Sequence, residues 1–84
     1  MILENLLYSY KQLPVEKHIV WMIDEILKIE IPDTKQLFKI NRWLGFIQGY
    51  LYTSHLRTIE ELKNETRGID DEFFNKIIYF GEIL

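Results

Sequence analysis

The sequence contains no cysteine among its 84 residues, and it has only four glycines and two prolines. Without cysteine, disulfide frameworks, thiol catalysis and cysteine-ligated zinc or iron–sulfur sites are excluded. No run of about 18 apolar residues is present, so we expect no membrane-spanning helix. The N-terminus has no basic region ahead of an apolar stretch, as a signal peptide would have. The lack of a membrane span and of a signal peptide predicts a cytoplasmic protein, whereas the lack of cysteine does not indicate a compartment.

Apolar residues make up 48% of the chain and aromatic residues 14%, a composition that excludes intrinsic disorder. A chain this short is expected to form a single helical domain over residues 1–84, because it is too short for two cores. The ten Lys and Arg residues are scattered among thirteen Asp and Glu residues. The net charge of −3 argues against a general nucleic-acid-binding role, which needs a concentrated positive field.

The apolar residues recur at helical spacing almost throughout, and no segment shows the alternation typical of a strand. This pattern predicts an all-α fold, a compact bundle of four to five short helices. A first helix, from about Ile2, should end before Pro14, which we place in the first turn of the second helix. The second helix should break at residues 31–33. The residues expected to be buried on it are Val15, Ile19, Ile23, Ile26 and Ile31.

A third helix is predicted from Thr34 to about Tyr52. Asp33 and Gln36 have the spacing of a capping box at its start. One side of this helix is apolar at steps of three and four residues, which predicts a core stripe. The stripe consists of Leu37, Ile40, Leu44, Ile47 and Leu51, and we expect Trp43, Phe46 and Tyr50 to widen it.

Two further helices are predicted in the C-terminal third. Thr58 and Glu61 form a second capping-box pattern, and the helix that they open should end by Gly68. Asp70 is expected to cap a last helix, with Ile69 and a phenylalanine at position 74 as a hydrophobic staple. The apolar side of that helix would consist of Phe73, Ile77, Phe80 and Leu84.

Gly45 and Gly49 lie four residues apart within the predicted third helix. Each interior glycine costs roughly 1 kcal/mol relative to alanine, so we expect another backbone to pack closely against this face. The first, second or last helix of the same chain could provide that backbone. A second copy or a partner protein is the alternative, and Asn41, Gln48 and Tyr52 would then rim the groove.

Trp21 is predicted to lie opposite Ile19 and Ile23 on the second helix, among charged residues. Tryptophan is enriched at binding hot spots, so we expect Trp21, His18 and Glu25 to contact a partner. The alternative is that another segment of the chain covers Trp21, which would make it a satellite of the core.

No catalytic constellation is present in the sequence. The carboxylate pairs at 60–61 and 70–72 lie at predicted helix starts, where negative charge offsets the helix dipole. The two histidines, His18 and His55, lack metal-ligand spacing. We therefore expect no enzyme activity, no metal and no cofactor.

Arg42, His55 and Arg57, with Tyr52 as a stacking platform, are a candidate set for a small anionic ligand. Such a ligand needs only two or three groups of this kind, so the low number of cations in the chain does not exclude it. A nucleotide or cyclic nucleotide bound at a subunit interface is the ligand that this set would suit.

The segment NRWLGFIQG at residues 41–49, followed by TIEEL at 58–62 and by Arg67, resembles a pattern in small uncharacterised helical proteins encoded by tailed bacteriophages. The resemblance covers roughly Leu37 to Arg67, over a third of the chain. It implies an accessory protein that acts in the host cytoplasm, and it brings no catalytic residues to transfer. Small phage proteins of this kind often block a host defence or metabolic protein, or sequester a signalling molecule.

These features together predict a non-enzymatic binding protein, a homo-oligomer, that inhibits a host protein. An anti-phage defence protein is one such target. The alternative is an oligomeric sponge that sequesters a nucleotide or cyclic-nucleotide signal at a subunit interface.

Overall fold

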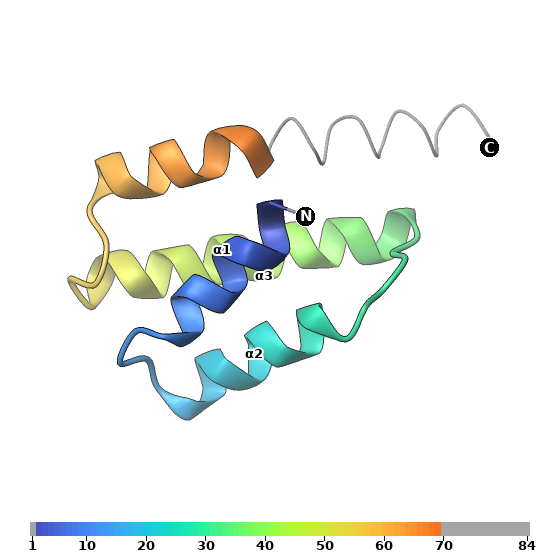
Figure 1. The fold of residues 1–84 in the computed structure, drawn as a ribbon, viewed down its shortest axis with the longest axis horizontal. Helices are drawn as coiled ribbons and strands as arrows, with labels where there is room; N and C mark the ends of the chain where they lie inside the picture. Colours follow the sequence, from blue (N-terminus) through green and yellow to red (C-terminus); the bar gives the residue numbers. More distant parts are fainter. Residues whose placement is uncertain (1, 70–84) are drawn as a thin grey trace.

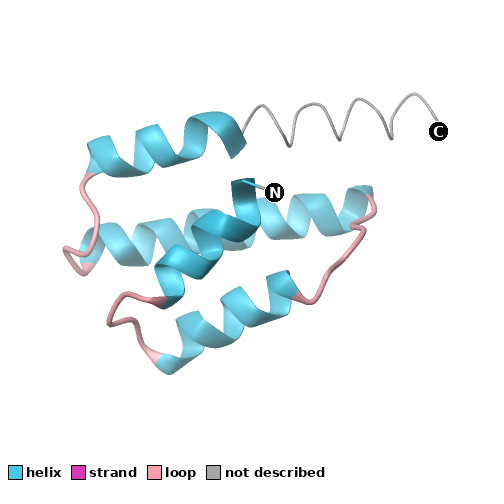
Figure 2. Cartoon of the chain, viewed as in Figure 1, coloured by secondary structure: helices cyan, strands magenta, loops and turns pink. Residues whose placement is uncertain are grey.

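The computed structural model describes residues 2–69 of the chain. Helix α1 spans Ile2–Lys11, α2 spans Lys17–Leu27 and α3 spans Thr34–Thr53. A fourth helix begins at residue 59 and continues to residue 69, the last that is described. These described residues contain helices and loops and no strand (Figure 2). The predicted all-α class is therefore confirmed, with four helices.

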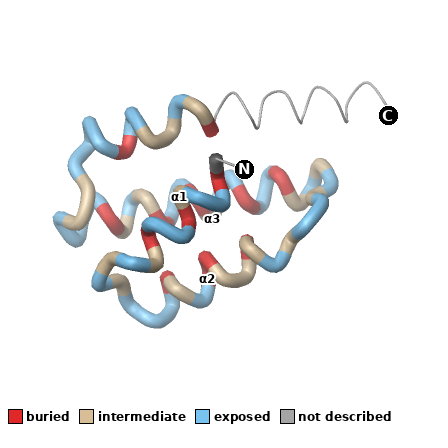
Figure 3. Tube along the Cα trace, viewed as in Figure 1, coloured by how far each residue is buried: buried red, intermediate tan, exposed pale blue. Residues whose placement is uncertain are grey.

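The longest helix, α3, is the one around which the others pack (Figure 1). Helix α1 crosses it, between α2 and the fourth helix. Each of the four helices contains buried residues, which are coloured red in Figure 3. The buried apolar cluster consists of Leu3, Leu7, Tyr10, Ile19, Met22, Ile23, Ile26, Leu37, Ile40, Leu44, Ile47, Leu51 and Ile69.

Helix α3 follows the sequence prediction closely. All five residues of the predicted stripe are buried. The capping box is formed in both directions: the Gln36 backbone N–H donates to the Asp33 carboxylate at 2.7 Å, and the Asp33 backbone N–H donates to the Gln36 side chain at 3.0 Å. Of the residues expected to widen the stripe, Trp43 and Tyr50 are half-buried, whereas Phe46 is exposed. The Phe46 prediction was wrong because this side chain points away from α2 and from the core.

Two predictions for the start and end of α2 were also wrong. Pro14 does not lie in its first turn, because the helix begins only at Lys17 after an extended N-cap residue, Glu16. The Glu16 backbone N–H donates to the Tyr50 hydroxyl at 3.2 Å, which ties the segment ahead of α2 to α3. Ile31 is 85% exposed because it lies on the segment that connects α2 to α3.

The fourth helix starts as predicted and does not stop as predicted. Thr58 and Glu61 form the capping box, with hydrogen bonds of 2.9 and 3.2 Å. Gly68 lies inside the helix, and no described glycine has the positive φ of a glycine C-cap. Ile69 is also helical, and it is buried. The predicted cap at Asp70 and the last helix lie outside the described residues.

Candidate functional site

An aromatic stack crosses the surface from α2 to α3. The His18 and Trp21 rings stack with their centroids 5.5 Å apart and an interplanar angle of 23°. Trp21 then meets Trp43 of α3 at 5.7 Å, in a tilted arrangement. The Lys39 ammonium lies 4.6 Å from the centroid of the Trp43 ring, within the range of a cation–π contact. The aromatic stack, defined here as these four side chains, joins two helices at the surface.

Trp21 lies between the two alternatives that the sequence left open. Its side chain is 49% exposed, so no other segment of the described chain covers it. One side of its indole is nevertheless held by Trp43. A large apolar side chain with a fixed orientation and half of its surface in solvent is typical of a binding contact.

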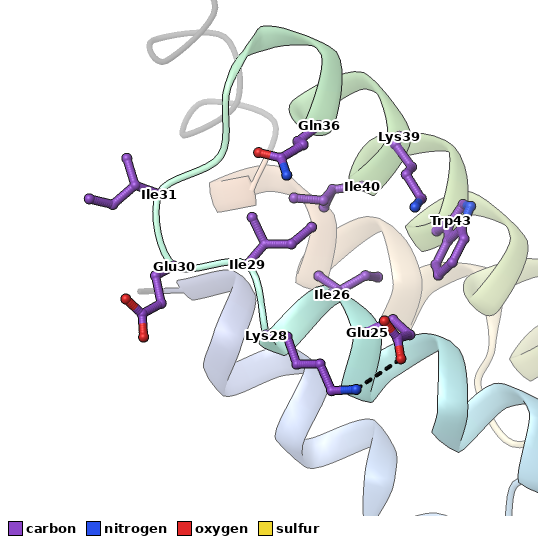
Figure 4. A pocket seen from close by; sticks show the side chains of 10 residues that line it. All are labelled: Glu25, Ile26, Lys28, Ile29, Glu30, Ile31, Gln36, Lys39, Ile40 and Trp43. Carbon is purple, nitrogen blue, oxygen red and sulfur yellow. Dashed lines mark hydrogen bonds and ion pairs between the residues drawn. The ribbon is translucent and has the colours of Figure 1, made fainter.

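A groove opens beside the aromatic stack, between the end of α2 and the start of α3 (Figure 4). Its volume is about 500 Å³. Ile26, Ile29 and Ile40 form an apolar floor, and Trp43 forms one wall. The α2–α3 groove, as we call it, is therefore continuous with the aromatic stack through Trp43.

The rim of the α2–α3 groove is charged. Glu25 lies at its edge and accepts a hydrogen bond from the Lys28 ammonium at 3.0 Å. This pair is exposed, so its energy is small and either group is available to another partner. Lys39 adds a second cation on the α3 side. The arrangement suits an apolar side chain flanked by polar or charged groups.

The predicted contact residues His18, Trp21 and Glu25 are thus brought to one side of α2. Trp43 and Lys39, which complete this surface from α3, were not among the predicted contact residues; Trp43 was expected only to widen the core stripe. Their spacing of four residues groups them on one side of α3, but it does not show that this side meets Trp21.

The glycine face does not pack within the described chain. Apart from the adjacent residues and the neighbouring backbone of α3 itself, no atom of residues 2–69 lies within 4 Å of a Cβ placed at Gly45 or at Gly49. Both glycines are exposed, because they lie on the side of α3 opposite the core stripe. The expected approach of the first or second helix was therefore wrong, and a last helix would fall outside the described residues. A close approach by a second copy or a partner remains a prediction.

The candidate anion-binding residues are not brought together within one chain. Arg42 and Tyr52 are ten residues apart on α3, a rise of about 15 Å. Arg57 is engaged by Glu65, with Nε 3.3 Å from the carboxylate, and it also donates to the Leu56 carbonyl. His55 lies in the turn after α3, where its φ of 60° is in the left-handed region. Tyr52, His55 and Arg57 thus lie around the turn after α3, and Arg42 could join them only from a neighbouring subunit.

A polar network joins α1, α3 and the fourth helix. The buried Tyr10 hydroxyl donates to Glu65 at 3.0 Å and accepts from Gln48 at 3.3 Å. Gln48 also donates to the Thr66 hydroxyl at 3.0 Å, so it does not rim an outer groove as the sequence suggested. Burial is the main cause that raises the pKa of Tyr10, and the nearby Glu65 carboxylate also raises it. All of these groups are hydrogen-bonded, which assigns the network to stability.

Within residues 2–69, no three His, Asp or Glu side chains are grouped so as to hold a metal ion. No helix in that range has both the length and the apolar character needed to cross a bilayer. No protein-family model matches the chain, and neither the curated proteins nor the solved structures contain a match to it.

Proposed function

We propose that this chain is a non-catalytic accessory protein that binds another protein through the aromatic stack and the α2–α3 groove. The observation on which the proposal rests is the half-exposed indole of Trp21, which contacts Trp43 beside a groove with an apolar floor and a charged rim. Following the resemblance to phage proteins, we propose that the partner is a host protein in the cytoplasm and that binding inhibits it. An anti-phage defence protein is one such partner.

The geometry supports a contact of low entropic cost. Immobilising a flexible side chain at an interface costs about 0.5–1.5 kcal/mol. Trp21 is already restrained between His18 and Trp43, so little of that cost remains. The groove beside it offers a floor for one apolar side chain of the partner, and Glu25, Lys28 and Lys39 offer hydrogen-bonding groups at the rim. This combination of an apolar centre and a polar rim is common to protein interfaces.

Affinity capture from bacterial lysate with the wild type, Trp21→Ala and Tyr8→Ala tests the proposal. Tyr8 is the matched control, since it is an aromatic residue on α1 with a similar exposure, 55% against 49%. We expect the wild type and Tyr8→Ala to capture the same bacterial protein, and we expect Trp21→Ala to fail to capture it. A captured set that Trp21→Ala leaves unchanged would refute the proposed surface.

Circular dichroism of the same variants separates binding from folding. Trp21→Ala loses two surface aromatic pairs, each worth about 0.5–1.5 kcal/mol beyond buried area, and should remain folded. Complete unfolding of this variant would mean that Trp21 is a core residue and would remove the main support for the proposal.

The second hypothesis is an oligomeric sponge for a nucleotide or cyclic nucleotide. Its candidate residues, Arg42, Tyr52, His55 and Arg57, would have to come from more than one subunit, because they do not converge within one. A ligand at 100 times its dissociation constant stabilises the protein by about 2.7 kcal/mol, which a thermal-shift assay detects. Melting temperatures that stay constant across a nucleotide panel would reject this hypothesis.

A further inference from the structure

The outer face of α3 is a second surface, distinct from the aromatic stack. Its residues recur at steps of three and four, as the core stripe does, but on the opposite side of the helix. They are Lys35, Phe38, Arg42, Gly45 and Gly49, with Phe46 beside them. Phe38 is 50% exposed and Phe46 is 59% exposed. Two large aromatic side chains in solvent, on either side of open glycine positions, leave an apolar helix face without a partner in the described chain.

The charge of this face is one-sided. The face has two cations, Lys35 and Arg42, and α3 contains no acidic residue, although acids outnumber bases in the chain as a whole; the third cation of α3, Lys39, belongs to the aromatic stack. Neither Lys35 nor Arg42 forms an ion pair with a carboxylate of residues 2–69. A complementary occupant would therefore be acidic as well as apolar.

The chain itself contains such a segment at residues 70–84. Four of these fifteen residues are acidic and one is basic, and eight are apolar or aromatic. The segment has a net charge of −3, and α3 has a charge of +3. Its apolar residues have helical spacing, and fifteen helical residues reach about 22 Å. The outer face from Lys35 to Gly49 extends about 21 Å along α3, at the same rise per residue.

The fourth helix bears on whether this occupant comes from the same chain. A return onto the same α3 would require a reversal after the fourth helix, and the sequence placed that reversal at Gly68. Gly68 is helical and the helix continues through Ile69. Nothing in the described chain therefore directs the following segment onto its own α3.

We propose that the outer face of α3 is covered by residues 70–84 of a second copy of this chain, in a reciprocal homodimer. Gly45 and Gly49 allow the partner's segment to approach the α3 backbone, and Lys35 and Arg42 pair with its carboxylates. The aromatic stack remains free for the partner protein of the proposed function. Failure of the dimer proposal would therefore not refute the proposed function, and the reverse also holds.

A charge swap on the full-length chain tests this interface. One variant combines Lys35→Glu with Arg42→Glu, and the other combines Asp71→Lys with Glu72→Lys. Lys35 and Arg42 are exposed, so the first variant should keep its fold, which circular dichroism checks. Tyr8→Glu, at an exposed position on α1, is the control and should behave as the wild type.

Light scattering after size-exclusion chromatography is the readout. We expect the wild type and Tyr8→Glu at twice the chain mass of 10.2 kDa and each double variant alone at the monomer mass. An equimolar mixture of the two double variants should return to the dimer mass. In the mixed dimer the acidic face of one variant meets the basic segment of the other, and the unaltered basic face meets the unaltered acidic segment. Phe46→Gln, which removes apolar contact without changing charge, should also be monomeric.

A monomeric wild type overturns the proposal, because residues 70–84 then do not cover the outer face of α3 in a second copy. A dimer that persists in Asp71→Lys with Glu72→Lys also overturns it, because the occupant would then be another surface. A mixture that stays monomeric removes the assignment of the ion pairs across the interface.

Discussion

Replacing Tyr10 with phenylalanine removes one hydroxyl group from a fully buried position and leaves the ring in place. That hydroxyl is the centre of the polar network, where it donates to Glu65 and accepts from Gln48. In the variant, Glu65 keeps Arg57 and Gln48 keeps Thr66, but each loses its second partner, the Tyr10 hydroxyl. A neutral hydrogen bond contributes about 0.5–1.5 kcal/mol to stability and one to a charged group about 1.5–3 kcal/mol, so the two together, both only partly buried, are worth about 1–3 kcal/mol. We expect a loss of that size in the free energy of unfolding at pH 7.

The pH dependence provides an independent check of the same contact. Burial raises the pKa of Tyr10 above its unfolded value of about 10, so the folded state retains the hydroxyl proton after the unfolded state has lost it. The stabilisation is therefore fully present below pH 10 and is lost as the pH rises above 10. Between pH 9 and pH 11 this linkage removes about 1.4 kcal/mol from the wild type, and none of it applies to Tyr10→Phe.

Urea denaturation followed by circular dichroism at pH 7, 9 and 11 measures both effects. Tyr8→Phe is the matched control, because this tyrosine is exposed on the same helix, and its stability should stay within about 0.5 kcal/mol of the wild type. The difference between wild type and Tyr10→Phe should shrink from pH 9 to pH 11. An unchanged urea midpoint for Tyr10→Phe at pH 7, or a constant difference across the pH range, would refute the assignment of the network.

Three further substitutions test the fold by the same urea assay. Ile47→Ala empties a fully buried position in the core stripe and should cost about 2–5 kcal/mol, and a loss below 1 kcal/mol would contradict its placement. Asp33→Ala removes the side chain that caps α3 and should cost about 0.5–2 kcal/mol, while an unchanged midpoint would mean that the cap is not formed in solution. In the double variant Lys35→Glu with Arg42→Glu, which should be monomeric, Gly45→Ala should raise the free energy of unfolding by up to about 1 kcal/mol, because no other described element opposes the new methyl group, and destabilisation would reveal a close neighbour within the chain.

The parts of the fold that sequence predicted well depend on local chemistry. The α3 stripe and both capping boxes are set by residues within four positions of each other, so spacing alone identifies them. The start of α2 is not given by spacing alone, since Glu16 is an extended N-cap whose backbone N–H contacts the Tyr50 hydroxyl of α3, 34 residues away in sequence. Gly68 was misassigned because glycine ends a helix only where the backbone adopts a positive φ, and composition does not determine that.

The candidate site was only half predictable for the same reason. Trp21, His18 and Glu25 share one side of α2, and a helical projection is sufficient to group them. Trp43 and Lys39 join them only when α2 packs against α3, which no spacing rule encodes. The separation of Arg42 from the turn after α3 is likewise a consequence of the length of that helix.

The role of Trp21 as a binding contact is tested most directly by calorimetric titration of the captured protein with wild type, Trp21→Ala and Tyr8→Ala. Truncation of a hot-spot tryptophan reduces the binding free energy by at least about 2 kcal/mol, which corresponds to an about 30-fold larger dissociation constant. We expect that loss for Trp21→Ala and a change of no more than about twofold, below 0.5 kcal/mol, for Tyr8→Ala. Equal affinities for all three proteins would show that the partner binds elsewhere, and the aromatic stack would then have no part in the interaction.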